Sequence, residues 1–400
     1  MTHSPTLIRT GMTPANTRPV ILSEFGPPAL ACIRSWGRNG LSTGMICIRS
    51  GNCTIPDSRY LESYCSLSPT VLFRPEGIRL IHDFLTRFNA TALIAINERI
   101  SCWLNDNRNL LPASVKVCTS PNSTTQAVLS KIAQLNAAKL VKFDVLPTYF
   151  IDKTKYIARD ILPEHFPLCL RPDAPNTTVP GFKVRIMHST DELLHFVEDL
   201  KSIDSPILAQ PFAELPNLVV HGARTQSGET MGISAFLVDR KFQGVTLTLR
   251  PHPIEKELQI KCTAFADYFD IVGNFHFEFL LDQKTGKVFF LELNSRLGGT
   301  TAKVFACGYD EPLLALAAHG VGQFISSPLS RRIVAGKHAL IKFCLYAITK
   351  RLSALDYPNQ STFMRLINSV YGLIVFKDEV LTLSDVRGSV AFYRSLISRG

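Results

Sequence analysis

The sequence has 400 residues, of which 46% are hydrophobic, so it is long enough for two or three lobes that share a large buried core. Lysine and arginine (43) outnumber aspartate and glutamate (33), but no basic run occurs, so the net charge of +10 favours small anionic ligands over nucleic acid. The ten cysteines are scattered without a CxxC pair, which argues against a zinc site or a disulfide framework and favours a reducing cytoplasm.

The N-terminal residues are polar and lack the apolar core of a signal peptide, and no stretch of the sequence has the length of a membrane span. We therefore expect residues 1–18 to form a disordered leader, and we expect no membrane partner. A strand at Val20–Leu22, a helix at Ala29–Arg38 and a strand at Gly44–Ile48 follow. This β-α-β order is typical of a parallel sheet flanked by helices, so it predicts an α/β domain over residues 19–120.

The middle of the chain carries cations at the ends of predicted elements. A long helix is predicted over Thr124–Lys142 and contains Lys131, and a later apolar strand ends in Arg171-Pro172. Residues 173–181 then contain one glycine and two prolines. Such a segment offers fewer free backbone N–H groups for a phosphate than a glycine-rich loop does.

Residues 218–249 alternate between strand and turn patterns, with turns expected at residues 226–228 and 239–241. An antiparallel sheet is therefore predicted here. Arg250 follows the last of these strands, where it could orient a substrate carboxylate. His221 and His252 are weaker candidates, because a lone histidine is more often packed in the core or at a solvent edge.

The segment from Phe275 to Thr301 has two apolar halves separated by Asp-Gln-Lys-Thr-Gly, which predicts a β-hairpin. If residues 283–287 form its loop, Glu278 lies directly across from Glu292. Two facing carboxylates on an apolar surface raise one another's pKa unless a cation lies between them.

A divalent cation fits this hairpin because Asn294 adds a third oxygen ligand to the two glutamates. Without a thiolate, the donor set suits Mg²⁺ or Mn²⁺ better than Zn²⁺, and magnesium usually completes its shell with substrate phosphates. Arg296 lies close enough to neutralise an anion bound to the metal. The alternative is an edge hairpin whose carboxylates are simply solvated.

The last quarter of the chain begins with a helix at Pro312–Ala318. A strand at Ala339–Tyr346 and a hairpin at Gly372–Leu383 are predicted after it. We interpret residues 326–400 as a small C-terminal subdomain with solvated charged faces.

The pattern of Glu278-Phe279 followed by Leu291-Glu292-Leu293-Asn294-Ser295-Arg296 resembles the metal-binding end of the ATP-grasp superfamily, in which Glu on one strand precedes Glu-x-Asn-x-Arg on the next. Residues 31–40 resemble the opening of its amino-acid-ligase members. The resemblance implies a combined α/β and α+β fold. It divides the chain into a pre-ATP-grasp parallel domain at residues 19–120 and an ATP-grasp domain at residues 121–325. The ATP-grasp domain contains a small ATP lobe at about residues 150–212, and a C-terminal subdomain follows at residues 326–400.

The same resemblance assigns roles to side chains. Glu278, Glu292 and Asn294 would hold the magnesium ions, Arg296 would contact the γ-phosphate, and Arg250 would orient the substrate. The residues expected to bind ATP are Lys131, with Lys139 and Lys142 as alternatives, Arg171, and Gln210, Phe212 and Glu214 from a hinge between the two lobes. Ser58-Arg59-Tyr60 would help to bind a carboxylate, although Arg59 fits a surface salt bridge equally well.

The function that the resemblance implies is an ATP-dependent carboxylate-amine ligase, similar to D-aspartate ligase and to the synthetase units of carbamoyl phosphate synthesis. Its cofactors would be ATP and Mg²⁺ or Mn²⁺, and its partners a small carboxylate and an amine, with a homodimer left open. Two alternatives remain: a nucleotide-binding protein with weakened catalysis, suggested by Ser130, Pro211 and the poor glycine loop, and an ATP-dependent phosphotransferase on the same fold.

Overall fold

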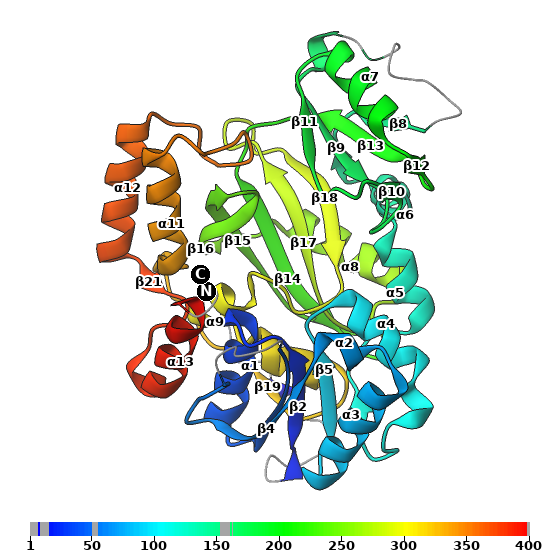
Figure 1. The fold of residues 1–400 in the computed structure, drawn as a ribbon, viewed down its shortest axis with the longest axis vertical. Helices are drawn as coiled ribbons and strands as arrows, with labels where there is room; N and C mark the ends of the chain where they lie inside the picture. The colour runs from blue at the N-terminus through cyan, green and yellow to red at the C-terminus, as the bar shows by residue number, and fades with distance from the viewer. Residues whose placement is uncertain (1–6, 9–15, 50–54, 153–160, 162, 398–400) are drawn as a thin grey trace.

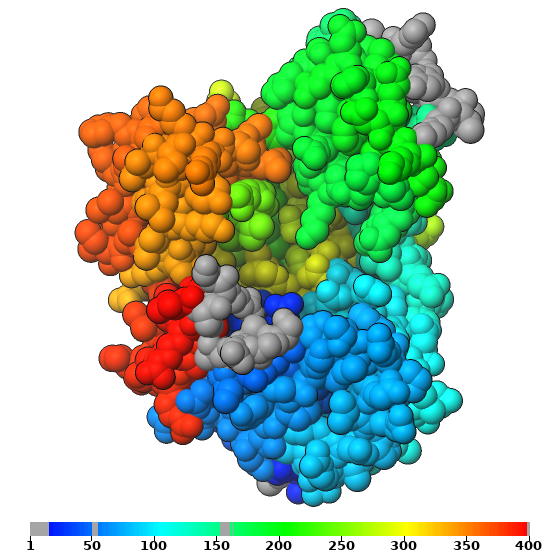
Figure 2. All heavy atoms as spheres, in the orientation of Figure 1, coloured from blue at the N-terminus to red at the C-terminus, as the bar shows by residue number. Residues whose placement is uncertain are grey.

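The computed structural model describes residues 7–8, 16–49, 55–152, 161 and 163–397. The chain folds into an N-terminal parallel sheet with helices, a central, mainly antiparallel sheet, a small lobe and a C-terminal helical region (Figure 1). The space-filling view shows a hollow between the small lobe and the C-terminal region (Figure 2). The N-terminal sheet, the central sheet and the small lobe each have a hydrophobic cluster, and two further clusters join the central sheet to the C-terminal region, one of them also reaching the N-terminal domain.

The N-terminal sheet is entirely parallel, which confirms the predicted α/β start. Its strand order is β4-β3-β2-β5-β6, and every residue of β3 is buried because helices cover both faces. The strands are β2 (Pro19–Ser23), β3 (Thr43–Ile48), β4 (Leu61–Leu67), β5 (Ala92–Ala95) and β6 (Lys116–Val117), and the helices are α1 (Pro27–Arg38), α2 (Pro69–Leu72), α3 (Pro75–Arg87), α4 (Glu98–Asp106) and the 3₁₀ turn Arg108–Leu110.

Residues 7–8 and 16–18 of the predicted disordered leader belong to the described part of the chain. Strand β1 (Leu7–Ile8) pairs in antiparallel fashion with β19 (Phe324–Ile325). Arg18 is also ordered, since its Nε donates to the carbonyl of Phe88 at 2.8 Å. Residues 1–6 and 9–15 of the predicted leader lie outside the described part of the chain.

The single helix predicted over Thr124–Lys142 is two helices, α5 (Asn122–Leu129) and α6 (Lys131–Leu140). Ser130 separates them with an extended backbone, and its hydroxyl accepts the amide of Ala133 at 3.1 Å as an N-cap. The Asp173 carboxylate accepts from the Ser130 hydroxyl and the Ile132 amide, both at 2.8 Å. A residue more than forty positions away therefore fixes the helix start.

The small lobe contains a four-stranded antiparallel sheet of order β11-β9-β13-β8, and helix α7 belongs to the same lobe. Leu168 and Leu170 alternate with the cavity-facing Cys169 and Arg171, because successive side chains of a strand point to opposite faces. Its elements are β8 (Tyr149–Ile151), the 3₁₀ turn Pro163–His165, β9 (Leu168–Pro172), β10 (Thr178–Val179), β11 (Arg185–Met187), α7 (Thr190–Asp199), β12 (Ser202–Ile203) and β13 (Ile207–Pro211).

The central sheet has eight strands in the order β21-β20-β16-β15-β14-β17-β18-β7. Strands β14, β15 and β16 form the predicted antiparallel sheet, and the hairpin of β17 and β18 pairs with β14. The expected turn at residues 239–241 is wrong, because these residues lie inside β15 and the chain reverses at Gln243-Gly244. Both have positive φ (50° and 75°), as a two-residue hairpin turn requires. The elements are β7 (Asp144–Val145), β14 (Asn217–Arg224), β15 (Thr230–Phe242), β16 (Val245–His252), α8 (Lys256–Tyr268), β17 (Gly273–Leu281), β18 (Val288–Asn294), α9 (Thr301–Ala306) and α10 (Glu311–Ala318).

The C-terminal region is mainly helical, and two predictions made for it are wrong. Residues 339–346 lie within α11, whose buried Leu340, Phe343 and Ala347 have helical spacing, and the expected hairpin is the end of α12 followed by a short strand. Strand β20 pairs with β16, so this region completes the central sheet. Its elements are β20 (Val334–Ala335), α11 (Lys337–Ile348), α12 (Thr362–Val375), β21 (Lys377–Asp378), the 3₁₀ turn Leu383–Asp385 and α13 (Val386–Ile397).

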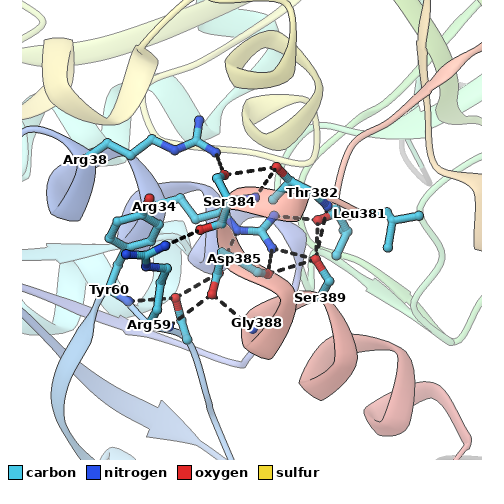
Figure 3. Close-up of polar contacts among 12 residues, drawn as sticks. Arg34, Arg38, Arg59, Tyr60, Leu381, Thr382, Ser384, Asp385, Gly388 and Ser389 are labelled. Atoms are coloured by element: carbon cyan, nitrogen blue, oxygen red, sulfur yellow. Dashed lines mark hydrogen bonds and ion pairs between the residues drawn. The ribbon is translucent and has the colours of Figure 1, made fainter.

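A buried ion pair ties the C-terminal region to the N-terminal domain (Figure 3). Arg34 Nε lies 2.9 Å from Asp385 Oδ2, and both side chains are almost fully buried. The Ser58 hydroxyl and the Gly388 amide donate to the same carboxylate.

In the described part of the chain, no helix is long and apolar enough to cross a bilayer.

Candidate active site

The predicted hairpin forms, but the pairing next to its loop is shifted by one residue from the prediction, since Leu281 pairs with Val288. A bulge between Glu278 and Phe279 restores the predicted pairing of the two glutamates. Glu278 on β17 is the direct partner of Glu292 on β18, and His276 is the partner of Asn294. Glu278 alternates with Phe277 and Phe279, which pack in the aromatic core on the other face of the sheet. The strand pattern therefore directs the carboxylates toward the hollow between the lobes.

Glu278 is the most perturbed carboxylate of this site. Its pKa is raised to about 7, first by burial and then by the nearby charge of Glu292, while Arg296 and Lys241 oppose the change. Asn217 Nδ2 donates a hydrogen bond to Glu278 Oε2 at 3.2 Å. A cation between the two carboxylates would relieve this electrostatic cost.

The oxygen donors around the pair fit a hard divalent cation. Glu292 Oε1 accepts from Asn294 Nδ2 at 3.2 Å, so the amide and the carboxylate of this strand lie together. Carboxylate and amide oxygens without thiolate are the ligands that Mg²⁺ takes in proteins. Glu278, Glu292 and Asn294 could thus hold the predicted metal.

Two cations approach the pair from neighbouring elements. Arg171 Nη1 lies 3.9 Å from Glu292 Oε2, and Arg171 Nη2 donates to Gln210 Oε1 at 2.7 Å. Burial lowers the pKa of Lys131, and the charge of Glu292 opposes this. Lys139 and Lys142 are exposed. Of the three lysines considered from the sequence, the structure brings Lys131 to the site.

A cavity of about 610 Å³ extends from the carboxylates to the hinge. Figure 2 shows the molecule hollowed between the small lobe and the C-terminal helices. The cavity is lined by Arg171, Gln210, Phe212, Glu214, Glu278 and Glu292 among the predicted residues. The segment at residues 173–181, which contains one glycine, also contributes to the cavity. Its last residue, Gly181, lines the cavity together with the following Phe182 and Lys183.

The hinge residues are held by specific contacts. Gln210 Nε2 donates to the Thr148 hydroxyl at 2.8 Å, and the Phe212 amide donates to the carbonyl of Pro167 at 2.7 Å. Phe212 thus lines the cavity while its backbone N–H is already bonded to Pro167. Glu214 follows the hinge strand and also lines the cavity.

Arg296 is anchored from the N-terminal domain. Its guanidinium forms an ion pair with Glu98, the first residue of α4, and its Nη2 lies 3.5 Å from Asn294 Oδ1. The side chain of Arg296 remains 24% exposed. This pairing couples the N-terminal domain to the end of β18.

The structure does not bring Arg250 to the cavity. Arg250 lies inside β16, where its partner Leu237 packs with Phe279 in the aromatic core, on the face opposite to Glu278. Its Nε donates to Asp239 Oδ2 at 2.9 Å. Strand alternation explains the difference, because the register across β14 and β15 decides which face an arginine on β16 occupies.

Two other candidates also lie away from the cavity. The Arg59 amide donates to Asp385 Oδ1 at 3.0 Å, and its exposed side chain lies at the junction with the C-terminal region (Figure 3). His252 Nδ1 contacts the carbonyl of Pro253 at 2.7 Å. The structure gives both residues local contacts.

A buried network supports the turn that follows Arg296. His221 Nδ1 lies 2.7 Å from Glu311 Oε1, and its Nε2 lies 3.2 Å from the Thr300 hydroxyl. The other oxygen of Glu311 accepts from the Thr301 hydroxyl at 2.6 Å. His221 is therefore a packed residue that helps to hold this turn.

Sequence reasoning missed two polar residues of the cavity. Lys241 Nζ donates to Asn217 Oδ1 at 3.0 Å, and Asn217 in turn donates to Glu278. Burial lowers the pKa of Lys241, with Glu278 opposing. The lysine was concealed in the sequence because residues 239–241 were interpreted as a turn.

Comparison with solved structures identifies the fold. The chain is similar to an N5-carboxyaminoimidazole ribonucleotide synthetase in complex with ADP (12% identity, TM-score 0.64), and the matched region covers 92% of this chain and 98% of that one. It is also similar to an L-amino acid ligase from Bacillus licheniformis (14% identity, TM-score 0.55, 77% and 75% covered). The chain has the ATP-grasp fold.

The ATP-grasp fold confirms the predicted fold class, including the parallel N-terminal domain. A third ATP-grasp structure is the biotin carboxylase domain dimer of Hydrogenobacter thermophilus 2-oxoglutarate carboxylase with magnesium ADP and bicarbonate, at 15% identity and a TM-score of 0.56, with 75% of this chain and 69% of that chain covered. No protein-family model matches the sequence, and no curated protein matches it. At these identities the likeness establishes the fold alone.

Proposed function

We propose that this protein is an ATP-dependent ligase that activates a small carboxylate as an acyl phosphate and joins it to an amine. The observation that carries the proposal is the facing pair Glu278 and Glu292 at one end of a cavity that also contains Arg171. Two opposed carboxylates that need a cation, next to a cation that suits phosphate, are what a metal–nucleotide complex requires. The ligase neighbours with bound ADP are consistent with this chemistry.

The residues would act by positioning and by stabilising charge. Arg171 and Lys131 would grip the phosphates, and Gln210 would hold the Arg171 guanidinium in place through their hydrogen bond. Glu278, Glu292 and Asn294 would hold Mg²⁺, which when bound supplies neutralisation of phosphate charge. Placed this way, the adenosine would extend along the cavity toward the hinge.

The transfer itself needs no side-chain nucleophile. A carboxylate oxygen of the substrate attacks the γ-phosphorus and ADP leaves; the amine then attacks the acyl carbon and phosphate leaves with that oxygen. Arg296, fixed by Glu98, would stabilise the charge that develops on the transferred group. We place this reaction in the cytoplasm.

A nucleotide-binding protein with weakened catalysis is the second candidate. It is favoured by the segment at residues 173–181, in which Asp173 is bonded to Ser130, Ile132 and Ser205 and one glycine is present. A segment tied in this way has less freedom to close over phosphates than a glycine-rich loop has.

The test is release of ADP and phosphate from Mg-ATP, screened over pools of amino acids and other carboxylates with and without amines. We expect release that depends on both an acid and an amine, and a product mass that matches the amide. Glu292→Gln should abolish the release of ADP and phosphate, and the variant should still fold in the absence of nucleotide. Binding of Mg-ATP without stimulation by any pool would support the second candidate.

A further inference from the structure

The connection between α11 and α12 contributes to the cavity wall. Ala354, Leu355 and Tyr357 line it together with the hinge, although they lie more than a hundred residues beyond the hinge in sequence. Figure 2 shows the C-terminal helical region and the small lobe facing one another across the hollow. This wall was not expected from the sequence.

The connection is anchored to the central sheet. The backbones of Tyr357 and Lys241 exchange two hydrogen bonds, at 2.9 and 3.1 Å. The Asp356 carboxylate accepts from the backbone amides of Gln243 and Ser353. The side chains at positions 355 and 357 are therefore presented to the cavity by a fixed backbone.

The connection also contacts polar residues of the site. Lys241 Nζ lies 5.2 Å from the centre of the Tyr357 ring, and the same ammonium donates to Asn217, the donor to Glu278. The Asn359 amide donates to Glu214 Oε1 at 2.9 Å. Because a backbone donor fixes one oxygen of this carboxylate, its orientation at the cavity is defined.

We infer that residues 353–359 form part of the nucleotide site, with Leu355 and Tyr357 as the wall that contacts base and ribose and the Asn359 amide as the group that orients Glu214. Leu280 and Leu291 line the same cavity from the central sheet. An aromatic ring and aliphatic side chains suit the flat apolar face of a purine, while a fixed carboxylate suits sugar hydroxyls. The inference rests on the proposed nucleotide-dependent function and assigns a further binding element to it.

The experiment is isothermal titration of the full-length protein with Mg-ADP. Tyr357→Ala keeps the backbone pairing with Lys241 and removes the ring, so we expect Kd to rise about tenfold. Tyr357→Phe keeps the ring and should bind within about twofold of the wild type. Phe363→Ala is the matched control, because it removes an aromatic ring that is 69% exposed on α12 and outside the cavity.

Leu355→Trp is a second test that removes no anchoring contact. Its larger side chain should fill the wall and weaken binding at least as much as Tyr357→Ala, with a melting temperature close to that of the wild type. If the wild type binds Mg-ADP, and both Tyr357→Ala and Leu355→Trp bind it with the same Kd as the wild type, the inference is overturned while the proposed function stands. If the folded wild type binds neither Mg-ADP nor Mg-ATP, the proposed function fails, and the inference fails with it.

Discussion

The buried Glu278 should make the metal-free protein less stable at alkaline pH, and Glu278→Gln should remove this effect. Its pKa is raised from an ordinary 4.5 to about 7, chiefly by burial and then by Glu292. Between these two values the folded state binds more protons than the unfolded state, so stability falls as pH rises through this window and is constant above it. The full difference corresponds to about 3 kcal/mol.

Urea unfolding of wild type and Glu278→Gln at pH 5 and pH 8, in EDTA, measures this contribution. Glutamine resembles the protonated acid, so we expect similar free energies of unfolding at pH 5 and a variant more stable by up to about 3 kcal/mol at pH 8. The contributions of other titrating groups cancel when the free energy of unfolding of one protein is subtracted from that of the other. If the free energies of unfolding of the two proteins differed by the same amount at pH 5 and pH 8, the assigned environment of Glu278 would be refuted.

Three further predictions concern cations and the domain junction. Arg171→Met should weaken Mg-ADP binding by about tenfold or more in titration calorimetry, whereas Arg250→Met, on the opposite face, should leave it unchanged. Lys131→Met should raise the KM for ATP in the ADP-release assay, and the exposed Lys139→Met should behave like the wild type. Asp385→Asn should lower the free energy of unfolding by about 3 kcal/mol or more in urea, because it leaves a buried guanidinium without its counter-charge; a loss below about 1 kcal/mol would contradict this.

The sequence predicted the hairpin well because its signals are local. Strand alternation and a polar turn predicted that Glu278 lies across from Glu292, but the sequence did not reveal the bulge between Glu278 and Phe279 on which this pairing depends. The same reasoning failed at residues 339–346, because a short apolar run fits a buried strand and a buried helix equally well. The predicted roles of the site residues stay predictions; Arg250, Arg59 and His252 lie away from the cavity, whereas the predicted metal ligands lie together at one end of the site.

Long-range contacts account for most of what the sequence could not predict. The break at Ser130 depends on Asp173, and the cavity wall depends on the pairing of Lys241 with Tyr357 across more than a hundred residues. Likewise, the face occupied by Arg250 depends on the register of three consecutive pairings in the central sheet. None of these contacts leaves a local pattern of hydrophobicity, charge or turn residues.

Transfer of oxygen from the acid to phosphate tests the central claim most directly. Purified protein would be incubated with Mg-ATP, an amine pool and carboxylic acids labelled with ¹⁸O in the carboxyl group, and the phosphate released would be analysed by mass spectrometry. An acyl-phosphate ligase must release phosphate that carries one labelled oxygen, together with an amide that has lost one. Unlabelled phosphate would indicate hydrolysis of ATP by water, and a stable phosphorylated product without free phosphate would indicate a phosphotransferase; either result would contradict the proposed ligase.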